Sequence, residues 1–254
     1  MESDLDVRQD EHVWTLTIRR PPHNFVNIEV FERLADTLEQ LDAQPQCRAV
    51  VLASEGKSFC AGADFSSSLE GGQMLDSARL YAQGLRLFRS CKPIVAAVHG
   101  AAIGAGVGLA LAADFRVTCP STRFSVNFNR LGFHPGFGLS HTLPRLIGLQ
   151  KAALLFYTGR RIGGAEAVAI GLADELADDG EVHRHAAELA RQIATSAPLA
   201  VQSTRQTLRQ SIADEVEAAL QRELGIQRDQ FKSADFIEGV AAMAARRTPI
   251  FRGS

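Results

Sequence analysis

The alternation of apolar and polar residues predicts the first elements of the chain. In Val13–Ile18 the apolar side chains fall on every second position, which is typical of a strand with one buried face. From Ile28 to Ala43 they recur at helical spacing, and Asn27 is suited to cap that helix. Short apolar runs predict further buried strands at Ala49–Ala53, Ile94–Val98 and Phe115–Thr118.

The order of elements predicts the fold class. Helical periodicity separates the strands at about Leu75–Ser90 and Gly104–Ala113, and strand followed by helix indicates an α/β fold with mainly parallel pairing. Strand signals fade after about Ala152. Four helical segments follow, at Glu181–Ala197, Leu199–Ile212, Ala213–Phe231 and Ala234–Arg246.

Composition and charge narrow the classes of function. The 254 residues are 46% hydrophobic and 22% charged, which is ordinary for a globular protein. With 27 basic and 29 acidic residues, the chain has no overall positive charge that would attract nucleic acid or anionic lipid. The four cysteines form no CxxC pair or zinc pattern. No secretory signal begins the chain, and His99 and several glycines interrupt the apolar stretch Ile94–Ala113, so we expect a cytoplasmic protein without a membrane span.

Two segments of small residues follow predicted strands, at Ser58–Phe65 and His99–Ala110. Backbone N–H groups at the carboxyl ends of strands are accessible to ligands. In the second segment these groups lie at the start of a predicted helix, whose dipole adds partial positive charge. Two such donors on one oxygen would form an oxyanion hole; tight glycine packing of helix on sheet is the alternative. The spacing of Gly104, Gly106 and Gly108 does not match a dinucleotide-binding fingerprint.

The motifs of this chain, taken together, resemble those of the enoyl-CoA hydratase/isomerase (crotonase) superfamily over nearly its whole length. The segments that carry the resemblance are Ser58–Phe65, Lys92–Asp114, Arg19–Pro22, Arg48–Leu52, Leu143–Gly148, Tyr157–Ile162, Ala165–Ala167, Gly171–Asp174 and Glu238–Gly253. The resemblance implies an α/β crotonase-type spiral of ββα units with a C-terminal α-helical trimerisation region. It divides the chain into a core with an acyl-CoA site (1–195) and a helical region (196–254), and it implies a homotrimer or a dimer of trimers.

The resemblance also implies the site residues. The backbone N–H groups of Ala63 and Ala105 correspond to the oxyanion donors, and Arg246 or Arg247 to the basic position that meets coenzyme A phosphates. Coenzyme A is then part of the substrate, and we expect no separate cofactor and no metal. The residues implied to line the substrate site are Phe25, Val26, Ala61, Gly62, Asp64, Phe65, Gly104, Gly108, Asn127 and Phe128.

The chain departs from the family at the two glutamates that hydratases use to add water. Gly108 and Phe128 stand at those positions, and neither can exchange protons. His134, on the loop that in relatives borders the acyl group, is a candidate acid or base, with a histidine satisfied by loop carbonyls as the alternative.

The sequence therefore predicts an acyl-CoA thioester enzyme, a lyase or isomerase, that stabilises a thioester enolate. Because both glutamates are missing, a decarboxylase or C–C hydrolase is an alternative reaction. A non-catalytic acyl-CoA-binding protein is an alternative of another class.

Overall fold

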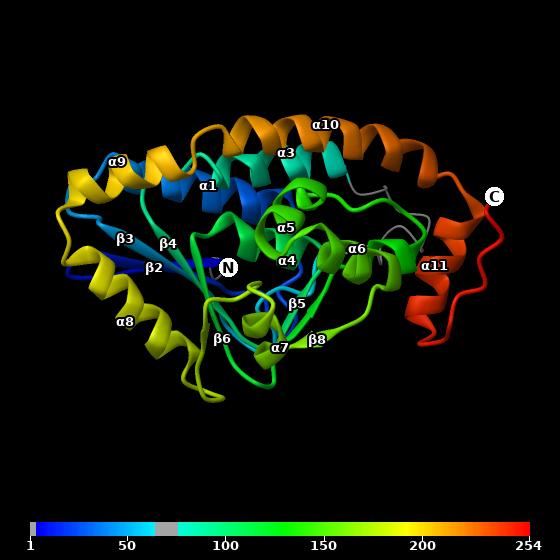
Figure 1. The fold of residues 1–254 in the computed structure, drawn as a ribbon, viewed down its shortest axis with the longest axis horizontal. Helices are drawn as coiled ribbons and strands as arrows, with labels where there is room; N and C mark the ends of the chain where they lie inside the picture. Colours follow the sequence, from blue (N-terminus) through cyan, green and yellow to red (C-terminus); the bar gives the residue numbers. More distant parts are fainter. Residues whose placement is uncertain (1–3, 64–75) are drawn as a thin grey trace.

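The computed structural model describes residues 4–63 and 76–254, and its largest sheet has six strands, whose labelled members lie in the left half of Figure 1. The strand order is β1-β2-β3-β4-β6-β9; β1 pairs antiparallel with β2, and the remaining neighbours are parallel. The strands are β1 (Leu5–Asp10), β2 (Val13–Ile18), β3 (Ala49–Ser54), β4 (Ile94–Val98), β6 (Phe115–Thr118) and β9 (Glu175–Leu176). The mainly parallel α/β fold predicted from the sequence is confirmed. The acidic segment that forms β1 was not predicted as a strand.

A second, three-stranded sheet lies beside the first and leads toward the candidate site. It contains β5 (Ala101–Ile103), β7 (Arg123–Ser125) and β8 (Ile162–Gly163) in the order β5-β7-β8. Cys60 forms a parallel bridge with Ala102 of β5, and Ala63 forms another with Val26. The described part of the first small-residue segment, up to Ala63, therefore lies between β5 and the segment that contains Val26.

Helices cover both faces of the large sheet, because alternate strand residues are apolar on both sides. Val50 and Leu52 of β3 belong to the core cluster that includes α1 and α3, whereas Val51 and Ala53 pack with the alanines of α8. The helices are α1 (Ile28–Asp42), α3 (Ser77–Leu87), α4 (Ala105–Ala112), the 3-10 helix η1 (Asn127–Leu131), α5 (Leu139–Ile147), α6 (Leu149–Thr158), α7 (Gly164–Ala169), α8 (Val182–Ala194), α9 (Pro198–Leu208), α10 (Ile212–Gln230) and α11 (Ala234–Ala244).

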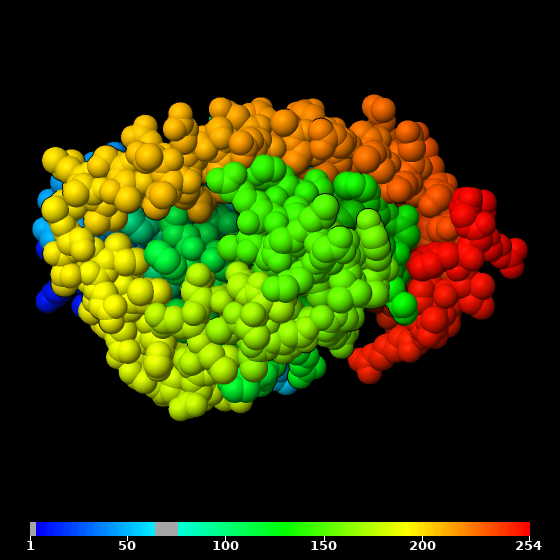
Figure 2. All heavy atoms as spheres, in the orientation of Figure 1, coloured from blue at the N-terminus to red at the C-terminus, as the bar shows by residue number. Residues whose placement is uncertain are grey.

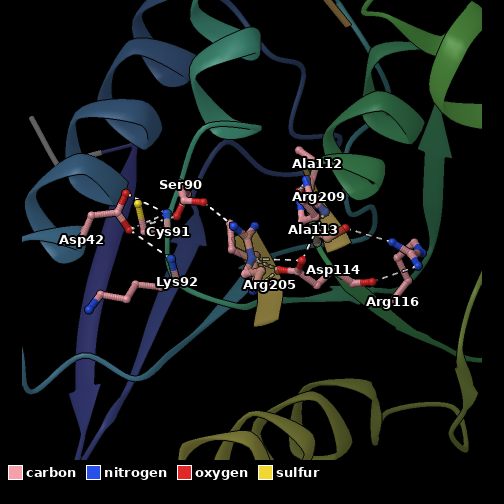
Figure 3. A network of polar contacts seen from close by, with 11 residues as sticks. Asp42, Ser90, Cys91, Lys92, Ala112, Ala113, Asp114, Arg116, Arg205 and Arg209 are labelled. Atoms are coloured by element: carbon pink, nitrogen blue, oxygen red, sulfur yellow. Dashed lines mark hydrogen bonds and ion pairs between the residues drawn. The ribbon is translucent and has the colours of Figure 1, made fainter. Parts of the chain in front are cut away.

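The predicted helical tail is present, and it lies along one edge and one end of the molecule (Figure 2). A buried ionic network joins α9 to the sheet (Figure 3). Asp114 accepts hydrogen bonds from Arg205 Nε at 2.9 Å, Arg209 Nη1 at 3.2 Å and the backbone N–H of Ile94 at 2.8 Å. These contacts join the helical region (196–254) to the core (1–195). The division of the chain between residues 195 and 196 stays a prediction.

Apart from Arg205, whose side chain is 9% exposed, helix α9 packs loosely on the single chain, and none of its apolar residues is buried. Leu199 and Leu208 on this helix are 81% and 72% exposed. Within residues 4–63 and 76–254, no helix has the length and apolar character needed to cross a membrane.

Candidate functional site

A cavity of about 410 Å³ lies where β5, η1 and α11 meet the Cys60–Ala63 segment. Its wall is mostly apolar. The described residues that line it are His23, Phe25, Ala61, Gly62, Ala63, Tyr81, Ile103, Gly104, Ala105, Asn127, Phe128, Leu131, Phe133, Val240, Met243 and Ala244.

Backbone hydrogen bonds fix one wall of this cavity. Cys60 donates its N–H to Ala101 O and accepts from the N–H of Ile103, both at 3.0 Å, while the N–H of Val26 donates to Gly62 O at 2.9 Å. Gly62 has φ +98°, and a Cβ atom there would lie 2.9 Å from the carbonyl oxygen of Ile103. Glycine is thus required for the chain to turn between these two neighbours.

Helix α4 begins at the same wall. Glycine at position 106 allows the helix to approach the backbone of Cys60, because a Cβ atom there would lie 2.1 Å from Cys60 O. The first N–H groups of a helix have no partner within the helix, and the helix dipole places partial positive charge there. Ala105 is the first residue of α4, so its N–H is an available donor. This N–H lies close to Gly62, since a Cβ atom built on Gly62 would be 4.0 Å from the nitrogen of Ala105.

The cavity wall contains few polar side chains. Among its described lining residues, His23, Tyr81 and Asn127 carry polar groups, and none is Asp, Glu, Lys or Arg. Behind the wall, burial raises the pKa of the Cys60 thiol to about 12, so this thiol stays protonated and is a poor nucleophile at neutral pH. No group of three or more His, Cys, Asp or Glu side chains in the described part of the chain could hold a metal ion.

Gly108 and Phe128, the two positions at which the family resemblance implies glutamates in hydratases, differ in their surroundings. The Phe128 ring lines the cavity, close to Gly104 and edge-on to Phe133 with ring centroids 5.5 Å apart. Gly108 lies behind the wall instead, where a Cβ atom would lie 2.3 Å from Cδ1 of Phe137. The space for a side chain at Gly108 is already filled by that ring.

Most of the described residues predicted for the site do line the cavity. These are Phe25, Ala61, Gly62, Ala63, Gly104, Ala105, Asn127 and Phe128. Val26 is buried and pairs with Ala63, and Gly108 packs against Phe137, so neither contributes to the wall. Asp64 and Phe65 lie outside the described residues.

His134 is half-buried and is not part of the cavity wall. Its Nδ1 lies 2.7 Å from Pro135 O, its backbone N–H donates to Gln230 Oε1 at 2.6 Å, and its carbonyl accepts from Gln227 Nε2 at 2.8 Å. Of the two roles considered for His134, these contacts agree with a histidine that braces its loop.

Several lining residues were missed by the sequence analysis. Val240, Met243 and Ala244 come from α11, which is remote in sequence, and nothing in their local pattern distinguishes a cavity wall from a core face. Tyr81 lies on the buried face of α3, so helical periodicity predicts its burial but not the cavity beside it.

Arg246 and Arg247, the two arginines implied to meet coenzyme A phosphates, do not line the cavity. Arg247 pairs with Glu238 through Nη1 and Nη2 at 2.6 and 2.7 Å, and this pairing lowers the pKa of Glu238 to about 2. Arg246 is exposed and has φ +52°. A role for either arginine in binding coenzyme A phosphates stays a prediction.

Comparison with known proteins assigns a family. The model of the family described as enoyl-CoA hydratase/isomerase matches residues 8–254. A probable enoyl-CoA hydratase of Bacillus subtilis is 34% identical over 98% of both chains, and the 1,2-epoxyphenylacetyl-CoA isomerase of Escherichia coli is 32% identical over 96% of both. The crystal structure of an enoyl-CoA hydratase/isomerase from Pseudoalteromonas atlantica superposes with a TM-score of 0.88 at 33% identity, covering 98% of this chain and 100% of that one.

Proposed function

The chain belongs to the enoyl-CoA hydratase/isomerase family, and we propose that it binds an acyl-CoA thioester and stabilises the enolate formed from it. The thioester oxygen receives hydrogen bonds from the backbone N–H groups of Ala63 and Ala105. The acyl group lies in the apolar cavity, and coenzyme A is carried in as part of the substrate.

The observation that carries this proposal is the presence of both alanines in one cavity wall. In the parallel bridge between Val26 and Ala63, Val26 bonds to the neighbours of Ala63, as its N–H does to Gly62 O, and not to Ala63 itself. The N–H of Ala63 is therefore directed away from Val26. Ala105 is the first residue of α4, so its N–H has no acceptor within the helix. Two donors fixed in advance stabilise the charge that develops on an oxygen, because they need no rearrangement during the reaction.

The proton chemistry differs from that of a hydratase with two glutamates. The described cavity wall holds no carboxylate, and Phe137 fills the space beside Gly108. A base-independent route to the enolate therefore suits this site. In a 2-carboxyacyl-CoA, the bond from Cα to the carboxylate breaks, CO2 leaves, and the electron pair becomes the enolate on the thioester oxygen; water then protonates Cα.

Two other activities use the same site and are separated by experiment. C–C bond hydrolysis would need water to attack a second carbonyl of the substrate, and a binding protein without turnover would keep only the two backbone donors. The relatives are named for hydration and for epoxide isomerisation, so the family by itself does not select the reaction.

Binding and turnover can be measured on the same purified protein. We expect calorimetry to detect crotonyl-CoA binding, and the absorbance of its conjugated thioester to stay constant because water is not added. We expect a 2-carboxyacyl-CoA such as methylmalonyl-CoA to release CO2. Rapid loss of the crotonyl-CoA absorbance would contradict the proposed proton chemistry, and absence of binding by both thioesters would contradict the function itself.

We also propose the homotrimer or dimer of trimers that the family resemblance implies. The exposed leucines of α9, Leu199 and Leu208, support a subunit contact on this helix. Light scattering coupled to size exclusion would give three or six times 27.5 kDa; a monomer mass would contradict the proposal.

A further inference from the structure

Three polar side chains on one face of α10 hold the loop that precedes α5. Helix α10 runs beside α3 and α5 (Figure 1), and Glu223, Gln227 and Gln230 recur at helical spacing along it. At the first end of the loop, Gln230 Oε1 accepts the backbone N–H of His134 at 2.6 Å, and Gln227 Nε2 donates to His134 O at 2.8 Å. Glu223 holds the other end, where α5 begins.

The carboxylate of Glu223 accepts three hydrogen bonds from the start of α5. Its Oε2 accepts the N–H of Gly138 at 2.8 Å, and its Oε1 accepts the N–H of Ser140 at 2.9 Å and the Ser140 hydroxyl at 2.6 Å. Glu223 is fully buried, so water does not compete for these donors. Hydrogen bonds to a carboxylate are stronger than those to a neutral acceptor, and the helix dipole favours negative charge at this end.

Phe137 lies between the two ends of the loop that α10 holds. It has φ +63° and Gly138 has φ +69°, and a phenylalanine adopts this conformation only where its surroundings impose it. The ring packs in the core, with centroids 5.2 Å from that of Phe31 and 6.0 Å from that of Tyr81. The bonds from α10 therefore hold Phe137 in place against its backbone preference.

The Phe137 ring in turn confines the first turn of α4. A Cβ atom on Gly108 would lie 2.3 Å from Phe137 Cδ1, so the ring lies directly against the helix backbone. A Cβ atom on Gly106, on roughly the opposite side of the helix, would lie 2.1 Å from Cys60 O. The turn that begins at Ala105 is thus held between a ring and a carbonyl group, and a packed interior transmits a displacement of either one.

We propose that Glu223 is a positioning residue for the backbone donor at Ala105, an inference that rests on the proposed function. The carboxylate fixes the loop, the loop fixes the Phe137 ring, and the ring fixes the start of α4 and with it the direction of the Ala105 N–H. Because a hydrogen bond weakens steeply with distance and angle, a small shift of α4 weakens this donor. Glu223 acts without touching the substrate, since it is not among the described residues of the cavity wall.

The carbonyl of a bound thioester reports the donor directly. Butyryl-CoA labelled isotopically at its carbonyl carbon would be bound to the protein, and its carbonyl stretch measured by infrared difference spectroscopy. In the wild type we expect a lower frequency than in the free thioester, because the two donors polarise the carbonyl. Ala105→Pro, which lacks one donor, sets the scale of a complete loss at that position.

Glu223→Gln tests the inference, because its amide places N–H groups opposite the N–H donors of α5. We expect this variant to lose about half or more of the difference between the wild type and Ala105→Pro. Calorimetry should give a butyryl-CoA affinity within about tenfold of the wild type, since one neutral hydrogen bond is at stake and the apolar wall is unchanged. Ser140→Ala deletes one of the three donors to Glu223 and should show a smaller loss of the same kind.

Glu217→Gln is the matched control, because Glu217 lies on the same helix, is 48% exposed and pairs with Arg89. It should keep the full wild-type shift. A full shift in Glu223→Gln, or in Ser140→Ala where Glu223→Gln does not fold, would overturn the inference and leave the proposed function in place. An equal loss in Glu217→Gln would overturn it as well. If the wild type does not bind butyryl-CoA, or binds it without a shift, the proposed function is wrong, and the inference is wrong with it.

Discussion

Phe137 occupies the space into which a side chain at Gly108 would project. Its Cδ1 lies 2.3 Å from the position of a Cβ atom at Gly108, and its ring also packs against Phe31 with centroids 5.2 Å apart. Phe137 adopts φ +63°, an unfavourable conformation for a non-glycine residue, so the surrounding packing holds it there. The absence of a glutamate at position 108 is thus linked to the hydrophobic core behind the cavity.

This relationship predicts that Gly108→Ala destabilises the protein. The added methyl must displace a buried ring, and overpacking of this kind costs about 1–3 kcal/mol of unfolding free energy in denaturant titrations. Gly225→Ala is the control, since Gly225 is exposed on α10 with no neighbouring atom within 4 Å. There we expect a gain of about 0.5–1 kcal/mol from helix propensity. Equal stability of Gly108→Ala and wild type would refute this account of the packing.

Removal of one backbone donor tests the oxyanion hole. Proline is accommodated at the first position of a helix and lacks the N–H, so Ala105→Pro deletes the donor of α4 with little change elsewhere. We expect the turnover number for the reaction that the wild type catalyses to fall by about 10²-fold or more. Ala105→Gly keeps the N–H and should retain turnover within about threefold. Similar rates for the two variants, with similar melting temperatures, would exclude the Ala105 N–H from the reaction.

The contacts of His134 predict a small effect of its removal. The ring lies outside the described cavity wall, and the glutamines of α10 bond to the backbone of this residue, which His134→Ala preserves. We expect the turnover number to stay within about twofold and its pH profile to keep its shape. A fall of tenfold or more, with the loss of a titration near neutral pH, would instead make His134 the acid or base of the reaction.

The pair formed by His99 and His183 predicts a pH dependence of stability. Their ring centroids are 5.2 Å apart; the His183 side chain is exposed to solvent on one side, yet its partial burial lowers its pKa, and the adjacent His99 lowers it further. Between this lowered pKa and the ordinary value of about 6.5, the unfolded chain binds a proton that the folded chain does not. Stability contributed by His183 is therefore present above about pH 6.5 and is lost as the pH falls through the lowered pKa.

Urea titrations between pH 5 and 8 measure this effect. We expect His183→Gln to reduce the pH dependence of the unfolding free energy relative to the wild type. His185→Gln, on the same helix but two positions away and so on a different face, should leave the wild-type dependence in place. An unchanged slope in His183→Gln would show that this residue does not account for the acid sensitivity.

The ionic network around Asp114 predicts a large loss of stability. The side chains of Asp114 and Arg205 are 12% and 9% exposed, so Asp114→Ala leaves buried arginines without their carboxylate. Removal of one partner from a buried pair costs about 3–5 kcal/mol of unfolding free energy. Asp229→Ala breaks an ion pair with Lys232 whose side chains are more than 70% exposed, and should cost less than about 1 kcal/mol. Comparable costs at the two sites would contradict the buried role of Asp114.

The sequence by itself determined the elements whose signals are local. Asn27 accepts the N–H of Val30 at 3.0 Å, as predicted for the cap of α1, and the strand Val13–Ile18 and the run Ile94–Val98 lie at their predicted bounds. Periodicity and capping depend on residues a few positions apart, so they can be predicted from the sequence alone. The motifs at Ser58–Phe65 and Lys92–Asp114, taken together with the others along the chain, indicated the family that the comparisons establish.

The tertiary structure decided everything that depends on contacts between remote segments. It brought Val240 and Met243 into the cavity wall and put Phe137 in the space beside Gly108. A packed interior is filled by whichever side chains the topology brings together, and sequence separation carries no record of that. The sequence predicted that Gly108 and Phe128 stand where the family has glutamates, and the packing showed that Phe137 fills the space beside Gly108.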